Sequence, residues 1–498
     1  MRRIPVLAIG LIVFFTSAAI LVLEIVAARL LAPYVGVTLQ TYTAIIGVML
    51  AGIAGGAWLG GRVADLTNPT RLVGPVLILG GLASLSSIPM LRYLGPKITS
   101  TDATSVIGLT ASVFLLPAVI LSMVQPLLTK AKLTDLGRVG RTVGGLSALS
   151  TAGALLGSFL TGFVLVPNFR SRVIVGIVGA SLIVLGIAVI ALTRASRSAG
   201  TNTLAILSIA AAVTAGSAQA ASSWRDPCQM ESSYFCARVE PDKGDDSRRL
   251  LVLDDGWHSK VDIDDPTYLE FEYTRAFRIA IDAWRTPPMK LRALHIGGGG
   301  FTIPRYLKAT RPGTDSMVYE VDPKLVELDQ QRLGLELTPD LRTKAGDGRQ
   351  NLRKAASKSF DLVIGDAFGG QSVPWHLATR EVAVDIRRVL VDDGLYVLNV
   401  IDSPPLKFIK AEIATVQSVF KHVAVLGFAD AFAAKSGANF VVVAADQPLP
   451  LPGLVSALKA DFAATGMELK EGPELARFVG NAQVLTDEFG PVDQLFTR

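Results

Sequence analysis

Hydrophobic positions along the chain follow two patterns, and the change lies near residue 221. Before it, long apolar runs succeed one another with few charges; after it, short apolar runs alternate with amphipathic stretches, and most of the Asp, Glu, Lys and Arg residues are found there. A helix of about 20 apolar residues is long enough to cross a bilayer. The pattern therefore predicts an α-helical multi-pass membrane domain over 1–221, followed by soluble structure.

Apolar runs that are long enough to cross a membrane lie near 5–32, 40–61, 72–94, 105–128, 143–166, 172–193 and 202–221. The run at 202–221 is weaker than the others because it is rich in Ala and Ser. It ends in Ala218-Gln219-Ala220, the small-residue pattern of a signal-peptidase site. We therefore predict six or seven transmembrane helices.

Basic residues are unevenly shared between the two sets of alternate loops. One set holds Arg2, Arg3, Arg62, Arg71, Lys130, Lys132, Arg138, Arg141, Arg194 and Arg197, whereas the other holds Arg92, Lys97, Arg170 and Arg172. Positive charge favours the cytoplasmic side, so the amino terminus is predicted to be cytoplasmic. Six spans then leave the soluble part in the cytoplasm, and seven place it outside.

Two features inside the apolar runs are unusual. Gly52, Gly56 and Gly60 recur every four residues, which leaves one helix stripe bare and favours close approach of another helix. Glu24 places a carboxylate within the first run, where an ionised group is costly. Glu24 is either a structural polar lock or part of a substrate or ion site, and its partner is either Arg29 or a residue of another helix.

The two cysteines, Cys228 and Cys236, are too few for a disulfide framework or a cysteine-built zinc site, and four scattered histidines offer no ligand cluster. We predict no metal site. If the run at 202–221 crosses the membrane, a disulfide could join the cysteines in an oxidising space; otherwise they are small buried hydrophobes. The net charge of +5 carries no nucleic-acid signature, so the lipid bilayer is the partner expected of the basic residues.

Beyond residue 221 the pattern predicts a linker with a small β domain over 222–290 and a Rossmann-like α/β domain over 291–498. Strands are expected at 234–240 and 248–255, and then at 292–297, 316–322, 360–367, 394–401, 422–429 and 438–446, with helices at 323–334 and 379–390. Apolar strands interleaved with helices favour a mostly parallel sheet covered on both faces. Ligands bind such sheets beyond the carboxyl ends of the strands.

Four consecutive glycines, Gly297, Gly298, Gly299 and Gly300, follow the first of these main strands. The dinucleotide fingerprint is incomplete because Thr302 stands where its last glycine is expected.

Acidic residues end the next strand-like elements: Glu320, which lies 23 residues beyond Gly297 (320 minus 297), Asp347 and Asp366. Single acidic residues after strands often only cap helices or turns. Together, beside the glycines, they indicate a site for a nucleoside without a pyrophosphate.

The motifs "LHIGGGG", "VYEVDPKLVEL", "AGDGRQNL" and "FDLVIGDAF" resemble, in this order, those of the polyamine aminopropyltransferases, the spermidine and spermine synthase family. The upstream stretches "LLVLDDGWHSK" and "DDPTYLEFEYTRA" resemble the small amino-terminal β domain of that family and the segment that leads to its active site. The resemblance covers about 230–445 and implies an S-adenosylmethionine methyltransferase-like fold. The complete layout resembles the bacterial membrane-fused branch, at the inner membrane.

The resemblance also implies roles for individual residues. The turn at 297–300 would lie against decarboxylated S-adenosylmethionine, or S-adenosylmethionine itself, as co-substrate. Glu320 would hold the ribose, and Asp347 would lie by the adenine amino group. Asp366 would be the catalytic carboxylate that helps to deprotonate the attacking amine, and Tyr268 would line the aminopropyl pocket.

The sequence departs from the family pattern at several positions. Gly300 replaces an Asp of the glycine motif, and Gly369 and Gly370 stand where a second Asp after Asp366 is expected. His258 replaces a glutamine and is a candidate substrate-binding residue, and the "YQ" pair of the family reads Tyr268-Leu269. Nucleoside binding is therefore better supported than the identity of the acceptor amine.

Three functions follow from these observations. The first is a membrane-bound transferase that moves an aminopropyl group to a small amine such as putrescine. The second is a methyltransferase that uses S-adenosylmethionine. The third is a transporter or receptor that binds a polyamine or nucleoside without chemistry, for which Glu24 is the best support. We expect the soluble domain in the cytoplasm, where S-adenosyl nucleosides are found, and a homodimer is compatible with the sequence.

Overall fold

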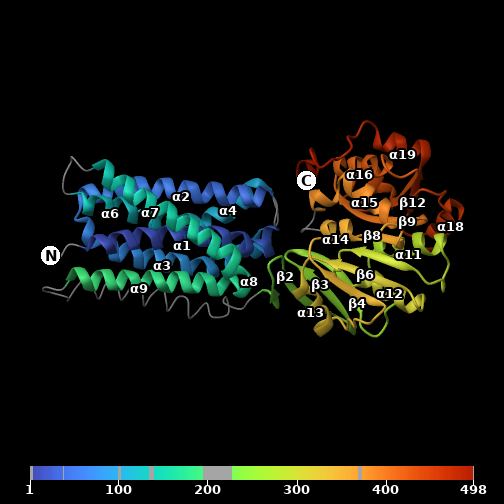
Figure 1. The fold of residues 1–498 in the computed structure, drawn as a ribbon, viewed down its shortest axis with the longest axis horizontal. Helices are drawn as coiled ribbons and strands as arrows, with labels where there is room; N and C mark the ends of the chain where they lie inside the picture. Colours follow the sequence, from blue (N-terminus) through green and yellow to red (C-terminus); the bar gives the residue numbers. More distant parts are fainter. Residues whose placement is uncertain are drawn as a thin grey trace. The chain divides into compact units, whose positions relative to one another are not determined.

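The computed structural model describes residues 4–36, 39–98, 102–133, 139–194, 227–367 and 373–496. The chain divides into two compact units, Met1–Cys236 and Ala237–Arg498 (Figure 1). The domain boundaries predicted after residues 221 and 290 stay predictions. The seventh apolar run, at 202–221, and the glycines at 369 and 370 lie outside the described residues.

The first unit is a bundle of α-helices. Its elements are α1 (Val6–Val35), α2 (Leu39–Leu66), α3 (Pro69–Leu94), α4 (Ala103–Thr110), α5 (Leu116–Ser122), α6 (Val124–Lys132), α7 (Val139–Leu160), α8 (Val166–Asn168) and α9 (Ser171–Arg194). They form six segments that are long and apolar enough to cross a membrane: Val6–Val35, Leu39–Leu66, Pro69–Lys97, Ala103–Lys132, Val139–Asn168 and Ser171–Thr193. These segments confirm the first six predicted runs.

The glycine stripe of α2 packs closely against α5 and α6, as predicted. A Cβ atom on Gly56 would lie 2.2 Å from the carbonyl oxygen of Val119, and one on Gly60 would lie 2.7 Å from the Cα atom of Met123. A side chain at either position would force the helices apart. These glycines therefore serve helix packing.

One end of the bundle carries an enclosed polar cluster. The Arg29 guanidinium of α1 donates to Glu231, with 3.1 Å between Nη2 and Oε1. The backbone N–H of Ser171, the first residue of α9, donates to Oε2 of Glu231 at 3.1 Å. Arg29 is thus paired with Glu231. Glu24 is partly buried and has no hydrogen-bond or ion-pair partner among the described residues, so both interpretations of Glu24 stay open.

The second unit begins with a small antiparallel sheet in which β2 (Cys236–Asp242) pairs with β3 (Asp245–Leu253), and β3 pairs with β4 (Gly256–Asp262). This is the predicted small β layer, with β4 as a strand that the prediction lacked. After it, α11 (Glu272–Trp284) leads into the main sheet.

The main sheet has eight strands in the order β12-β10-β11-β9-β8-β5-β6-β7. The strands are β5 (Arg292–Ile296), β6 (Asp315–Glu320), β7 (Leu341–Ala345), β8 (Phe360–Gly365), β9 (Leu390–Asp402), β10 (His422–Phe428), β11 (Ala438–Ala445) and β12 (Met467–Glu471). The run β9-β8-β5-β6-β7 is parallel, whereas β11, β10 and β12 are joined to it and to one another by antiparallel pairing. The sheet is therefore mixed.

Helices cover both faces of this sheet. One core packs α15 (Arg380–Val389), α16 (Lys407–Gln417) and α19 (Gly472–Val479) against strand residues such as Leu294 and Val363. The other packs α11, α12 (Thr302–Thr310) and α18 (Leu451–Asp461) against the alternate residues, such as Ala293 and Leu362. The remaining main helices are α13 (Pro323–Arg332) and α14 (Gly348–Lys354). The predicted fold class is confirmed.

Candidate active site

Four adjacent parallel strands, in the order β8-β5-β6-β7, end at the same edge of the sheet. The glycine turn follows β5, Glu320 ends β6, Asp347 follows β7 and Asp366 follows β8. Parallel pairing brings the carboxyl ends of neighbouring strands together. The three predicted carboxylates therefore end neighbouring strands at the edge where the glycine turn lies.

The glycine turn has no room for side chains at two of its positions. Gly297 has a φ of +99°, and a Cβ atom on it would lie 2.2 Å from the carbonyl oxygen of Asp366. A Cβ atom on Gly300 would lie 2.7 Å from that of Ser259 in β4. The Ser259 hydroxyl also accepts a hydrogen bond from the Gly300 N–H at 2.9 Å. Ser259 therefore fills the space that a side chain at position 300 would need.

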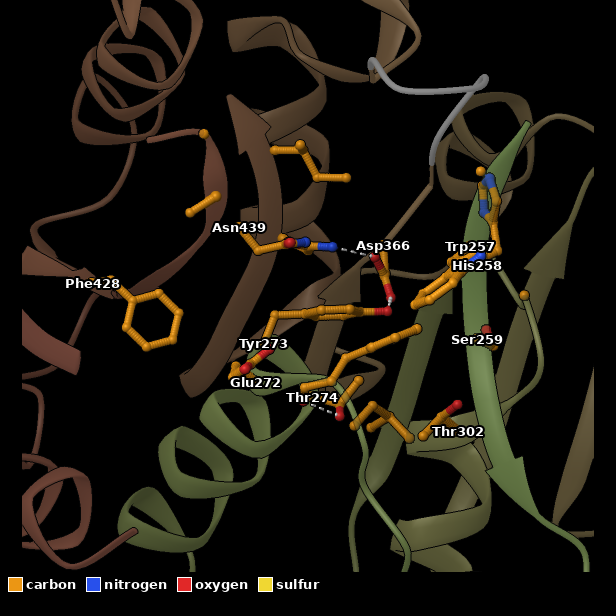
Figure 2. Close-up of a pocket in the computed structure, with 18 of the residues that line it drawn as sticks. Trp257, His258, Ser259, Glu272, Tyr273, Thr274, Thr302, Asp366, Phe428 and Asn439 are labelled. Atoms are coloured by element: carbon orange, nitrogen blue, oxygen red, sulfur yellow. Dashed lines mark hydrogen bonds between the residues drawn. The ribbon is translucent and has the colours of Figure 1, made fainter. Parts of the chain in front are cut away.

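A cavity of about 820 Å³ opens beside the turn, entirely within the second unit (Figure 2). Its wall is formed by β4, the first turn of α11, the glycine turn and the ends of β8, β9 and β11. Gly297, Gly298 and Gly299 line the cavity, whereas Gly300 does not. This volume is in the range of small-molecule sites.

Asp366 faces this cavity and is held by neutral donors. Its Oδ1 accepts a hydrogen bond from the Asn399 amide at 2.9 Å, and its Oδ2 accepts one from the Tyr273 hydroxyl at 3.2 Å (Figure 2). Asn439 in turn donates to the Asn399 side-chain oxygen at 2.9 Å. Desolvation by the surrounding protein raises the pKa of Asp366 to about 6, against the lowering effect of the two hydrogen bonds. The carboxylate is thus able to exchange a proton near neutral pH.

Glu320 and Asp347 lie at the same sheet edge but do not line the cavity. Glu320 is 5% exposed and accepts hydrogen bonds from the N–H groups of Gly298, at 2.7 Å, and Asp322, at 3.0 Å. Burial raises its pKa. Asp347 caps α14 through the Gln350 N–H at 2.8 Å, and its other oxygen lies 2.9 Å from Nε2 of His376. Glu320 therefore points to the glycine turn, and Asp347 combines a helix cap with a partly exposed carboxylate.

The structure places the two predicted substrate residues differently. His258 lines the cavity, and desolvation lowers its pKa to about 4, so the imidazole is neutral at neutral pH. Tyr268 does not line the cavity. Its hydroxyl donates to Glu270, and the Arg248 guanidinium lies 4.5 Å from the centre of its ring. The role of Tyr268 stays a prediction, while Tyr273 is the tyrosine that meets Asp366.

Sequence reasoning missed Tyr273, Asn399 and Asn439. Each asparagine is a polar residue within an otherwise apolar strand, in "LYVLNVI" and "ANFVVVAA". This contrast could have indicated from the sequence that the two residues belong to a site. Tyr273 lies in the first turn of α11, only five positions after Tyr268, and the choice between the two depends on where that helix begins.

Comparison with known proteins supports the motif assignment. No family model matches this chain. A curated relative, the polyamine aminopropyltransferase of Vibrio vulnificus, is 28% identical over 218 residues, which cover 42% of this chain and 71% of the relative. Over this segment the chain is similar to polyamine aminopropyltransferases. These relatives are transferases, and the six apolar helices of this chain fit the membrane-fused branch of that family.

Two further proteins are similar to parts of this chain. A crystal structure of a probable spermidine synthase from Corynebacterium glutamicum is 25% identical, with a TM-score of 0.48, and the match covers 51% of this chain and 94% of that chain. The N-terminal histidine N-methyltransferase of Emericella nidulans is 27% identical over 162 residues, which cover 32% of this chain and 29% of that protein.

Proposed function

We propose that this chain is a membrane-bound, spermidine-synthase-like enzyme that transfers an aminopropyl group from decarboxylated S-adenosylmethionine to a putrescine-like amine. The observation that carries the proposal is the Asp366 carboxylate, which faces the cavity, is held by neutral donors and has a pKa of about 6.

The charges around the cavity favour cationic ligands. Its wall includes Glu272, Asp366 and Asp430, and no Lys or Arg lines it among the described residues. Asp430 is paired with Lys435 at 2.9 Å, whereas Glu272 and Asp366 have no ion-pair partner among the described residues. A diamine and a decarboxylated sulfonium nucleoside are both cations. S-adenosylmethionine would instead bring a carboxylate into a wall that offers it no cation.

The transfer needs a free amine lone pair. A primary ammonium group has a pKa of about 10, so the acceptor arrives protonated. Asp366 accepts that proton. Its raised pKa reduces the difference in pKa between the ammonium group, which gives the proton, and the carboxylate, which accepts it. The amine nitrogen then bonds to the aminopropyl carbon beside the sulfonium. The carbon–sulfur bond breaks, its electron pair goes to sulfur, and methylthioadenosine leaves.

Neighbouring groups would position the reactants. Tyr273 and Asn399 fix the Asp366 carboxylate, and Asn439 fixes Asn399. A fixed base is effective because little reorganisation remains at the moment of reaction. We assign His258, which lines the cavity as a neutral imidazole, to substrate binding.

The nucleoside part of the donor would lie against the glycine turn. We assign Glu320 to the ribose hydroxyls because its carboxylate is fixed beside Gly298 by a 2.7 Å hydrogen bond. Asp347 is assigned to the adenine amino group because it ends a nearby strand and is partly exposed. The absence of a side chain at positions 297–299 lets the nucleoside approach the backbone.

A methyltransferase is the second candidate, and the similarity to a histidine N-methyltransferase favours it. The two reactions give different products. Full-length protein in detergent, incubated with putrescine and decarboxylated S-adenosylmethionine, is expected to yield spermidine and methylthioadenosine. S-adenosylhomocysteine formed from S-adenosylmethionine would support the methyltransferase instead. Binding of either nucleoside without any turnover would support a non-catalytic receptor or transporter.

A further inference from the structure

Residues 194 and 227, between which the chain is not described, lie at opposite ends of the helix bundle. Helix α9 begins at Ser171 and ends at Arg194, and its 24 residues rise about 36 Å, enough to cross the hydrocarbon core. The chain is next described from Pro227, and Glu231 contacts Ser171 at the start of α9. Residues 227–231 therefore lie at the end of the bundle opposite to Arg194.

The contact that holds residue 231 there is an enclosed ion pair. Both Nε and Nη2 of Arg29 donate to Oε1 of Glu231, at 3.2 and 3.1 Å, and the side chains are only 17% and 9% exposed. Arg29 lies near the carboxyl end of α1, so α1 and α9 are antiparallel and meet at this cluster. An ion pair removed from water is stable only with good geometry, and here the Ser171 N–H adds a further hydrogen bond.

A disulfide between Cys228 and Cys236 encloses the same segment. Disulfides persist in oxidising compartments and are rare in the cytosol, where thiols are kept reduced. The end of the bundle that carries Arg29 and Glu231 therefore faces an oxidising space. Of the two fates that the sequence left open for these cysteines, the structure has the disulfide.

The distribution of positive charge places the opposite end in the cytoplasm. The end shared by the start of α1 and the end of α9 carries the more basic loops, with residues such as Arg71, Lys130 and Lys132, and cytoplasmic loops are those enriched in Lys and Arg. The charge pattern and the disulfide are independent observations, and both give the bundle the same orientation.

We infer that the second unit, with its cavity, lies on the extracytoplasmic side of the membrane. All six segments that could cross a membrane among the described residues precede Pro227, so the described chain offers no later helix that would return it to the cytoplasm. This side is opposite to the cytoplasmic one that the chemistry alone led us to expect. Taken with the proposed function, it has a consequence for substrate supply.

The donor is permanently charged because its sulfur is a sulfonium, and it does not diffuse through a bilayer. If S-adenosyl nucleosides are made in the cytoplasm, a transport step must deliver the donor before aminopropyl transfer. This consequence rests on the proposed function, whereas the orientation itself does not.

The orientation is tested with full-length protein in intact cells by a thiol reagent that does not cross membranes. Lys358→Cys places a thiol on the second unit, at a side chain that is 62% exposed, and Leu66→Cys places one at the basic end of the bundle, at a residue that is 84% exposed. We expect Lys358→Cys to be labelled equally in intact and lysed cells, and Leu66→Cys only after lysis. Lys358→Cys labelled only after lysis would overturn the inference.

A second readout needs no substitution. Cells are quenched in acid, and free thiols are counted in the native chain before and after reduction. We expect both cysteines to react only after reduction, and two free thiols without reduction would overturn the inference. Neither readout depends on catalysis, so a failed activity assay would leave the orientation unaffected, and a failed labelling test would leave the proposed reaction unaffected.

Discussion

Glu231 in the first unit and Asp366 in the second are both enclosed carboxylates, but different donors hold them. Glu231 accepts hydrogen bonds from the Arg29 guanidinium and the Ser171 N–H, so a positive charge balances its own. Asp366 accepts hydrogen bonds from the neutral groups of Asn399 and Tyr273, and desolvation raises its pKa to about 6.

This difference separates structural from chemical roles. A carboxylate paired with a guanidinium has a structural role, because loss of the carboxylate or of its charge would leave the buried guanidinium uncompensated. A carboxylate held only by neutral donors can gain or lose a proton while its neighbours stay in place. Substitutions at Glu231 and Asp366 should therefore change different properties of the protein.

The largest effect is expected for Asp366→Asn. Removal of the general base should lower the rate of transfer by about 10²–10⁴-fold, with the protein still folded. The measurement is methylthioadenosine formation by full-length protein. Asp392→Asn is the matched control, since that side chain is 79% exposed and its one ion pair among the described residues is with Lys358. An Asp366→Asn rate equal to that of this control would contradict the assignment.

Arg29→Met should have the next largest effect, and on stability alone. It leaves Glu231 enclosed without a cation, at a cost of about 3 kcal/mol. The thermal midpoint in detergent should fall, and the transfer rate per folded molecule should be unchanged. Adding Glu231→Gln to this variant should recover part of the midpoint. A lower transfer rate at full stability would show that the cluster serves the chemistry.

Glu412, in α16, is a third enclosed carboxyl group, and unlike Asp366 it does not line the cavity. It is 4% exposed, its Oε2 has no hydrogen-bond partner among the described residues, and burial raises its pKa from 4.5 to about 8. The folded protein thus holds this proton more tightly than the unfolded chain does. The stability that the bound proton contributes is present below pH 4.5 and is lost as the pH rises through about 8.

Glu412→Gln should remove this pH-dependent loss of stability, because glutamine does not titrate. The free energy of unfolding of the native protein should fall with pH in this window by up to about 1.4 kcal/mol per unit more than that of the variant. Denaturant unfolding at several pH values measures both. Parallel pH profiles for the native protein and Glu412→Gln would be the contrary result.

Tyr273→Phe tests whether neutral donors set the proton affinity of Asp366. The hydroxyl lowers the pKa of Asp366, so its removal should raise that pKa above about 6. Less carboxylate is then present at pH 6, and the rate there should fall about tenfold, as expected for one hydrogen bond to a charged group. The loss should shrink at high pH. A pH–rate profile that does not move upward would refute this role.

Tyr268→Phe should have the smallest effect. Its hydroxyl bonds Glu270 outside the cavity, so removal should change the transfer rate by only about twofold, within about 0.5 kcal/mol. The family resemblance implies the opposite, a tyrosine in the aminopropyl pocket. The KM for the donor and the rate, measured beside Tyr273→Phe, decide between Tyr268 and Tyr273 as the pocket tyrosine.

Much of the fold could be predicted from the sequence because it depends on local pattern. Six helices follow from the length and hydropathy of the apolar runs, and six strands of the main sheet follow from apolar β-type segments. The strand at 467–471 was missed, and the strand at 341–345 was implied before Asp347 but given no bounds, because "MELKE" and "LRTKA" alternate charged and apolar residues. Both are edge strands of the sheet, where one side is exposed and charges are tolerated.

The site was only partly predictable, since it depends on long-range register. Parallel topology was enough to bring Glu320, Asp347 and Asp366 to the edge that bears the glycine turn. The hydrogen bonds between Asp366, Asn399 and Asn439 depend on how β8, β9 and β11 align, and no local pattern specifies that alignment. The ion pair that joins Arg29 to residue 231 is likewise a contact across 202 positions.

The most direct test of the central claim is the pH dependence of methylthioadenosine formation from decarboxylated S-adenosylmethionine and putrescine. The account predicts that the native protein forms methylthioadenosine with an acid limb near pH 6, the pKa of Asp366, and that Asp366→Asn is about 10²–10⁴-fold slower and lacks the limb. Folded native protein that forms no methylthioadenosine at any pH, or an Asp366→Asn variant with the native profile, would contradict it.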